Sequence, residues 1–217
     1  MTGIFYINQK TIVIESFLTL VKGFFLNSST YHQTEKEIDR EQKIIKLCKE
    51  NPRYFAPIYE KYYDAIFVFI YKRVADEYIC ADLTSIVFYK SLKNINKYKF
   101  QGLPFSSWLY RIALNEVNQY FRDKKTAQRV VCLDKGHLVH LFEEIEIDND
   151  GYETEKTVAK LLESLSEQDL QFLELRFFES RSFKEIGDLL GTTEGNAKIK
   201  TYRILRKLKE VAVKSAY

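Results

Sequence analysis

Apolar residues recur at intervals of three and four positions in both halves of this chain, a spacing typical of α-helices that bury one face. The clearest stripe in the first half consists of Phe55, Ile58, Tyr62, Ile66 and Phe69. The same period continues in the next segment with Ile79, Leu83 and Ile86. No segment alternates apolar and polar residues over a useful length, which argues against β-sheets. We therefore expect an all-α fold.

Turn-forming residues are scarce, and this scarcity supports the helical interpretation. The 217 residues include only 8 glycines and 3 prolines, whereas these two types together average about 12% of residues in proteins. Turn-rich sandwiches, propellers and proline-rich linker proteins are thereby excluded. The apolar fraction of 46%, with 15% aromatic residues, also excludes global disorder and is sufficient for a buried core.

Cysteine spacing and hydropathy indicate a cytoplasmic protein without direct membrane insertion. Cys48, Cys80 and Cys132 lie far apart and lack the spacing of a zinc site, a redox dithiol or a disulfide scaffold. The apolar stretch at residues 4–26 is interrupted by polar and charged residues. It therefore matches neither a membrane span nor a signal peptide.

Charge is strongly segmented along the chain, although the net charge is only +3. Residues 97–129 contain seven basic and two acidic residues, and residues 198–214 contain seven basic residues and one acidic residue. Between them, residues 134–155 contain eight acidic residues and one lysine. This order predicts two positively charged modules joined by an acidic connector.

Residues 182–208 have the pattern of a helix-turn-helix. Ser182 and Glu185 have the spacing of a capping box, which starts a short helix. Gly191 ends that helix, because a glycine accepts the left-handed conformation of a tight turn, and Thr193 caps the next helix. A short helix, a glycine turn and a longer basic helix are typical of DNA-binding modules.

The second helix of this pattern has an apolar face and a basic face. We expect the buried face to consist of Ala197, Thr201, Ile204, Leu208 and Val211. The residues expected to point outward are Lys198, Ile199, Tyr202 and Arg206, with Arg203 beside them. Such a face suits phosphates and base edges, and the alternative is a basic helix that only keeps a solvated surface.

Two groups of motifs, in this order, resemble bacterial sigma factors of the sigma-70 superfamily. Residues 185–191 (EIGDLLG) and 194–198 (EGNAK), with the Tyr-Arg pair at 202–203, resemble the C-terminal promoter-reading domain. Residues 81–84 (ADLT) and 87–88 (VF) resemble the helix that docks on the polymerase clamp. Residues 105–113 (FSSWLYRIA) resemble the helix that melts and binds the promoter. With no other domain visible, the resemblance is to the compact extracytoplasmic-function (ECF) group.

This resemblance implies two small helical domains joined by an acidic flexible linker. Residues 41–130 correspond to sigma region 2, 131–155 to the linker and 156–217 to region 4, whereas residues 1–40 form an extension of unknown role. Such a factor binds core RNA polymerase and promoter DNA, directs initiation, and is held by an anti-sigma factor. It is not an enzyme, and it needs neither a cofactor nor a metal.

The resemblance also assigns roles to individual residues. Contacts to the upstream (−35) element are expected from Lys198, Ile199, Lys200, Tyr202, Arg203 and Arg206. Contacts to the downstream (−10) element are expected from Lys97, Lys99, Trp108, Arg111, Asn115 and Arg122, with Lys124 and Lys125 as further cations. Rings that can stack on unpaired bases are Tyr98, Phe100 and Trp108. Polymerase contacts are expected from Asp82, Leu83, Ser85 and Ile86.

Several of these residues have a second interpretation. Trp108 is equally compatible with a place in the core, and Asp82 with a solvated carboxylate. Where the family has a Gln-Glu pair, this chain has Ser85-Ile86, which makes the docking surface more apolar. Ile199 replaces a small polar residue, and we expect it to pack against a thymine methyl.

Other classes of function remain as alternatives. A stand-alone helix-turn-helix regulator, whose first module senses a ligand or dimerises, would carry the same C-terminal motif. The acidic linker is either a nucleic-acid mimic inside the polymerase or a solvated tether. The histidines at 137 and 140 lie near carboxylates, but their loose spacing does not favour a metal site. No catalytic motif is present in the sequence.

Overall fold

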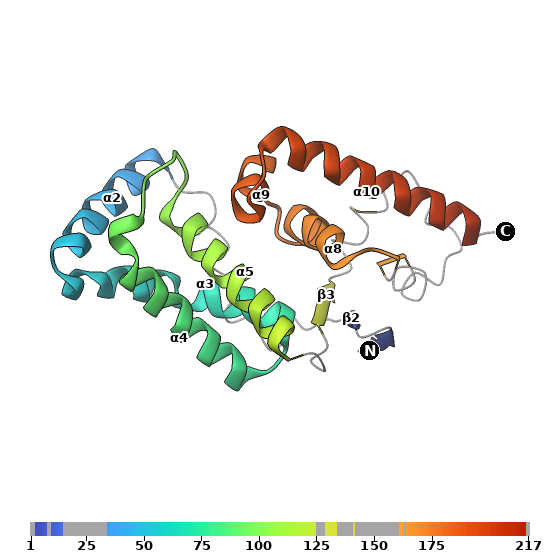
Figure 1. Cartoon of the computed structure of the whole chain (residues 1–217), viewed down its shortest axis with the longest axis horizontal. Coiled ribbons are helices and arrows are strands. Elements are labelled where there is room, and N and C mark those ends of the chain that lie inside the picture. Colours follow the sequence, from blue (N-terminus) through green and yellow to red (C-terminus); the bar gives the residue numbers. More distant parts are fainter. Residues whose placement is uncertain are drawn as a thin grey trace. The chain divides into compact units, whose positions relative to one another are not determined.

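Two units make up the chain in a computed structural model (Figure 1). The structure describes residues 3–7, 10–14, 34–124, 129–133, 141, 161–162 and 164–215. One unit runs from Leu20 to Ala127, and the other combines Met1–Thr19 with Gln128–Tyr217. The first unit contains the helices that precede residue 125, and the second contains the C-terminal helices and a small sheet.

The first unit is built from four α-helices and two short 3-10 turns among its described residues. Its elements are α2 (Glu35–Glu50), η2 (Pro52–Phe55), α3 (Ala56–Val74), α4 (Glu77–Lys93), η3 (Ile95–Lys97) and α5 (Phe105–Asp123). Local sequence starts two of them: Thr34 and Glu37 form a capping box on α2, and the Asp76 side chain accepts the Ile79 amide at the start of α4.

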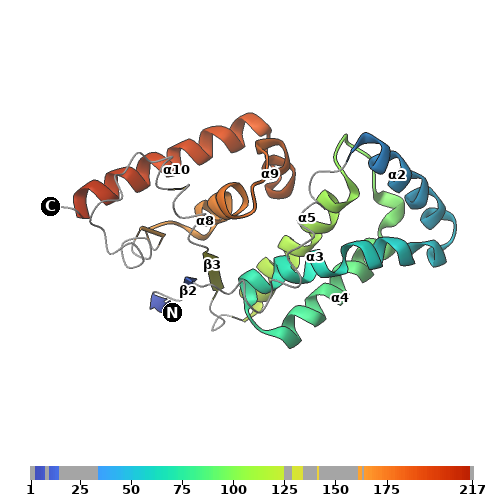
Figure 2. The same ribbon diagram turned by 180° about the vertical axis from the view of Figure 1, so that it is seen from behind.

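Helices α3, α4 and α5 pack against one another around the core of this unit, and α2 contacts α5 and both short turns (Figures 1 and 2). The five residues of the predicted stripe on α3 and η2 are all buried, as expected. On α4, Leu83 is buried but Ile86 is 38% exposed. The inward residues of α4 are Cys80, Leu83, Thr84, Val87, Phe88 and Ser91.

The second unit contains a short helical array. Its elements are α8 (Glu167–Leu173), the π-helical turn η4 (Glu174–Phe178), α9 (Phe183–Leu190) and α10 (Glu194–Ser215). The Ser166 side chain caps α8 by accepting the Asp169 amide at 3.1 Å. Leu170, Leu173 and Phe177 are buried, as their helical spacing predicts.

A three-stranded sheet belongs to the second unit. Strand β1 (Gly3–Ile7) pairs antiparallel with β2 (Lys10–Ile14), and β2 pairs parallel with β3 (Arg129–Leu133). The two predicted helical domains are confirmed, whereas these strands were missed. The strands are only five residues long, too short to show the alternation that was sought, and β2 and β3 have consecutive β-branched residues in place of it.

Part of the predicted organisation lies outside the described residues. This holds for Lys125, for residues 134–140 and 142–160 of the acidic segment, and therefore for His137 and His140. The predicted boundary at residue 41 falls within α2, which begins at Glu35. Within the described ranges, no helix has the length and apolarity needed to cross a membrane.

Candidate nucleic-acid interface

Helices α9 and α10 form a helix-turn-helix whose turn is fixed by local hydrogen bonds. Ser182 and Glu185 make the predicted capping box at the start of α9. Gly191 ends the helix in the left-handed conformation, with φ 68° and ψ 35°. The Thr192 amide donates to the Gly187 carbonyl at 2.8 Å, and the Thr193 hydroxyl accepts the Asn196 amide at 3.2 Å. These bonds orient α10 relative to α9.

Gly187 allows the turn to approach α9 closely. A Cβ atom at this position would lie 2.9 Å from the Thr192 carbonyl oxygen and 3.1 Å from the Glu194 amide nitrogen. Both neighbours are backbone atoms, which cannot move aside as a flexible side chain can. The absence of a side chain at Gly187 therefore sets the distance between the two helices.

The inner face of α10 matches the prediction with one difference. Ala197, Thr201, Ile204 and Leu208 are buried, whereas Val211 is only partly buried. Leu205 and Ala212 are buried in addition. The buried face is wider than a single stripe because α10 packs on both α8 and α9.

The outer face of α10 brings together five of the six residues assigned to it. Lys198, Arg203 and Arg206 are exposed, and Ile199 and Tyr202 are 52% and 46% exposed. Lys200 lies elsewhere, because its Nζ atom is 3.3 Å from the Asp169 carboxylate and 4.8 Å from the centre of the Phe172 ring. The sequence could not separate Lys200 from its basic neighbours, since its partners come from α8.

A second basic surface lies on α5 of the first unit. Trp108, Arg111, Asn115 and Arg122 follow one another at spacings of three, four and seven, so they share one face of the helix. Arg111, Asn115 and Arg122 are exposed, as are Lys97 and Lys99 before the helix and Lys124 after it. The structure thus places all six predicted −10 residues along α5 and the segment that leads into it.

Three aromatic rings pack together where this segment meets α5. The Tyr98 ring contacts Phe105 at 5.0 Å and Trp108 at 5.3 Å between ring centres. Tyr98 is only 7% exposed, whereas Phe100 is 50% exposed. Trp108 packs in this cluster and keeps part of its surface accessible. Tyr98 is part of the core, and Phe100 is exposed.

A third surface lies on the outer side of α4. Asp82, Ser85 and Ile86 are exposed there, whereas Leu83 is 7% exposed and belongs to the core. The Ser85 hydroxyl donates to the Ala81 carbonyl of its own helix at 2.9 Å. Tyr78 and Tyr89 are 86% and 62% exposed. Along α4, the steps from Tyr78 to Asp82, to Ser85 and to Tyr89 are four, three and four residues, so these four residues lie on the same side of the helix. These tyrosines were missed, although their spacing was visible in the sequence.

The two cysteines whose side chains the structure describes, Cys48 and Cys80, are buried. Burial raises the pKa of Cys80 to about 12 and also raises the pKa of Cys48, so both thiols stay protonated and inert at neutral pH. Within residues 34–124 and the described part of 161–215, no three His, Cys, Asp or Glu side chains lie close enough together to hold a metal ion.

Two helical units, each with a basic exposed face, are the arrangement expected of a protein that contacts DNA through two domains. Comparison with known families identifies the family to which the chain belongs. Sigma-70 region 2 matches residues 58–127, and Sigma-70 region 4 matches residues 161–210. The chain belongs to the sigma-70 family of RNA polymerase sigma factors, in its ECF group. Members of this family are initiation factors, not enzymes.

Similar proteins include two named sigma factors. The ECF RNA polymerase sigma factor BldN of Streptomyces coelicolor is 30% identical over 157 residues, which cover 71% of this chain and 58% of BldN. RNA polymerase sigma factor SigZ of Bacillus subtilis is 28% identical over 154 residues, which cover 71% of this chain and 84% of SigZ. The solved structure of CnrH, in complex with the cytosolic domain of CnrY, matches 79% of this chain and 96% of CnrH, with a TM-score of 0.50 and 16% identity.

Proposed function

We propose that this chain binds core RNA polymerase and directs it to initiate transcription at specific promoters. The observation that carries this proposal is the pairing of two basic exposed faces, on α5 and α10, in the two units that match sigma regions 2 and 4. The polymerase catalyses RNA synthesis, whereas this chain recognises the promoter sequence and helps to open the DNA strands.

The outer face of α10 would read the −35 element. Lys198, Arg203 and Arg206 are exposed cations suited to phosphates, which position the helix without reading sequence. Ile199 and Tyr202 lie between them and would contact base edges in the major groove. Lys200, although proposed from the sequence for the same element, is held by Asp169 and Phe172 and would contribute little.

A pair of lysine variants distinguishes these roles. Lys198→Ala is expected to weaken binding of a −35 duplex and to lower the slope of log affinity against log salt by about 1, because one phosphate contact is lost. Lys200→Ala removes the same charge from the same helix but is expected to leave that slope unchanged. The partly exposed ion pair of Lys200 contributes at most about 0.5 kcal/mol to stability. Fluorescence anisotropy at several salt concentrations measures the slope for each variant. Equal slopes for the two variants would contradict the proposal that Lys198, and not Lys200, contacts a phosphate.

Ile199→Ser tests whether the exposed isoleucine reads a base. If Ile199 packs on a thymine methyl, the variant should lose about 1 kcal/mol of binding on thymine-containing sites and little on sites where uracil replaces thymine. Competition binding of the wild type and the variant to the two matched duplexes measures the difference. Equal losses on both duplexes would show that Ile199 has no base-reading role.

The exposed face of α5 would bind the −10 element. Lys97, Lys99, Arg111 and Arg122 supply positive charge for the phosphates, and Asn115 supplies a side-chain amide for a phosphate or base edge. Opening the duplex leaves unstacked bases, and an exposed ring stabilises each by about 1–3 kcal/mol. Phe100 is the most accessible ring in this segment, and Trp108 offers a part of its surface.

The outer side of α4 would dock on core polymerase. Asp82 provides a charge, and Ile86 provides exposed apolar surface together with the flanking Tyr78 and Tyr89. Tyrosine is enriched at the centre of protein interfaces because it buries a large ring and keeps one hydrogen-bonding group. Ser85 lies within this surface, whereas Leu83 would act by holding α4 in place from the core.

We also propose an inhibitory partner and a location for the free protein. A chain with two basic faces would bind nucleic acid non-specifically unless they are covered. An anti-sigma factor would cover them. CnrH, whose fold is similar, has been solved in complex with the cytosolic domain of CnrY. The protein would act in the cytoplasm, where the polymerase works.

Run-off transcription with purified core polymerase tests the proposed function. We expect initiation at a defined position on a template from the source genome, together with tight promoter binding only in the presence of core polymerase. A stand-alone regulator would instead bind its own duplex without polymerase, as a dimer on a palindromic site. Failure to direct initiation from any genomic template would overturn the proposal.

A further inference from the structure

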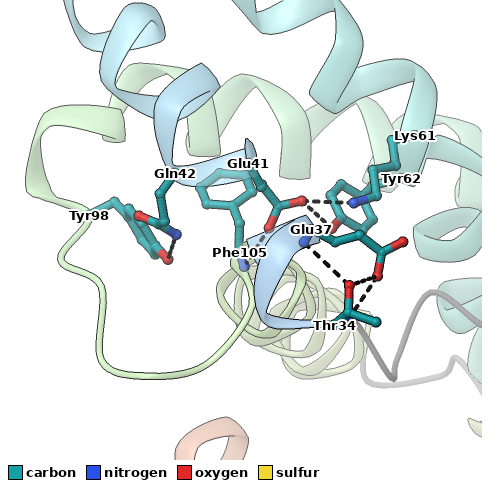
Figure 3. Close-up of polar contacts among 8 residues, drawn as sticks. All are labelled: Thr34, Glu37, Glu41, Gln42, Lys61, Tyr62, Tyr98 and Phe105. Carbon is teal, nitrogen blue, oxygen red and sulfur yellow. Dashed lines mark hydrogen bonds and ion pairs between the residues drawn. The ribbon is translucent and has the colours of Figure 1, made fainter. Parts of the chain in front are cut away.

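Helix α2 is hydrogen-bonded to both ends of the segment that leads into α5 (Figure 3). At the first end, the Gln42 side-chain amide donates to the Tyr98 hydroxyl at 3.1 Å, and Lys49 Nζ donates to the Tyr98 carbonyl at 3.0 Å. At the second end, the Phe105 amide donates to Glu41 Oε2 at 3.0 Å. One helix therefore fixes the start and the end of the loop at residues 99–104.

Glu41 replaces a helix cap that α5 cannot supply for itself. The N-cap residue of α5 is Pro104, which makes no side-chain capping bond. The Glu41 carboxylate, from a helix that ends far earlier in the chain, accepts the first amide of α5 and lies at the positive end of its dipole. Glu41 is 2% exposed, and it also accepts bonds from the Tyr62 hydroxyl and from Lys61 Nζ. This carboxylate joins α2, α3 and α5.

The two fixed ends are also packed against each other. The Tyr98 and Phe105 rings meet edge to face at 5.0 Å between centres, which closes the loop at its base. Beyond this point the loop turns at Gly102, whose φ of 74° is in the left-handed region. Lys99 and Phe100 lie exposed on the closed loop.

We propose that Glu41, Gln42 and Lys49 are positioning residues that hold this loop in the shape that receives the −10 element. They act through Tyr98 and Phe105, to which they are hydrogen-bonded. All three precede residue 58, where the match to sigma region 2 begins. The inference rests on the proposed function, because the loop has this role only if the chain opens promoters.

Fixing the loop in advance lowers the cost of capturing bases. A loop that must first become ordered uses part of its binding energy for that ordering, whereas a loop held at both ends does not. Loss of the two Tyr98 bonds should therefore leave the promoter contacts in place but make strand opening slower. A misplacement of about 1 Å is enough for effects of tenfold or more.

The test uses the full-length chain with core polymerase and the double variant Gln42→Leu/Lys49→Met. Gln42 is half-buried and Lys49 is exposed, so the variant retains the apolar stems and is expected to fold. The matched control is Lys46→Met, an exposed lysine on the same helix. Lys49→Arg serves as the conservative variant, because a guanidinium can still donate to the Tyr98 carbonyl.

Three readouts test the positioning role, and the first of them follows the loop itself. Trp108 is the only tryptophan of the chain and packs on Tyr98, so its fluorescence reports on the base of the loop. In the double variant we expect stronger quenching by acrylamide, about tenfold slower promoter opening, and weaker discrimination between single-base changes in the −10 element. Binding to core polymerase and to a −35 duplex should be unchanged. Lys46→Met and Lys49→Arg should behave as the wild type.

The outcomes separate this inference from the proposed function. Unchanged opening and unchanged base discrimination in the double variant, while Phe100→Ala slows opening, would overturn the positioning role and leave the sigma-factor function intact. Equal loss of −35 binding and opening would also overturn it, because the effect would then be a general loss of folding. If the wild-type chain directs no initiation, both proposals fail.

Discussion

Gly187→Ala is expected to distort the helix-turn-helix and to weaken binding to a −35 duplex about tenfold. The added methyl group would lie 2.9 Å from the Thr192 carbonyl oxygen, closer than Cβ atoms approach such an oxygen. The turn must then move away from α9, and α10 moves with it because Thr193 and Glu194 begin that helix. We expect a loss of about 1–3 kcal/mol in stability, the range found for overpacked sites.

Gly195→Ala is the matched control for this prediction. It adds the same methyl group in the first turn of α10, where the new Cβ would have no atom within 4 Å apart from its chain neighbours and its own helix backbone. Since alanine favours helix over glycine by up to about 1 kcal/mol, this variant should keep or raise the melting temperature. Calorimetry of both variants and anisotropy of Gly187→Ala with a −35 duplex measure the effects. Equal melting temperatures for the two variants would show that the close approach at Gly187 does not constrain the fold.

Glu41→Ala is expected to destabilise the first unit by about 3 kcal/mol. The change removes the acceptor for three donors at once, namely the Tyr62 hydroxyl, Lys61 Nζ and the Phe105 amide. Tyr62 and Phe105 are fully buried, so their donors would lose a partner without gaining water. The start of α5 would also lose its only side-chain acceptor among the hydrogen bonds of the described residues.

Chemical denaturation followed by circular dichroism measures this loss. Glu50→Ala, an exposed carboxylate on the same helix, is the control and should change stability by no more than about 0.5 kcal/mol. Glu41→Gln keeps an oxygen acceptor in place and should fall between the two. A Glu41→Ala variant as stable as Glu50→Ala would contradict the capping role of Glu41.

Local signals in the sequence predicted much of the helical structure. Ser182 with Glu185, Gly191 and Thr193 act within a few residues of themselves, so their roles were readable before any packing was known. The buried stripe of α3 was equally readable, because a helix of 3.6 residues per turn has one inner face. The outward-facing residues of α10 followed from the same geometry.

Features that depend on distant partners were not readable. Glu41 lies in a stretch of charged residues whose pattern is typical of a solvated helix. Its buried partner, the Phe105 amide, lies 64 positions later in the chain. From the sequence alone, Lys200 resembles the other lysines expected to face DNA. Only the structure shows that Asp169 and Phe172 lie beside it. Ile86 follows the buried Leu83 at a helical step of three and was also expected to contact polymerase, and only the packed structure shows that it is exposed.

The sheet imposes an order of events during synthesis. Strand β2 is complete at Ile14, but its parallel partner β3 begins only at Arg129. At about 5–20 residues per second, the ribosome needs roughly 6 to 23 seconds to make the chain between them. For that time the open edge of β2 has no partner within the sheet, and such an edge attracts other strands. The helices α2 to α5 are thus all translated before the hairpin at the start of the chain can be covered.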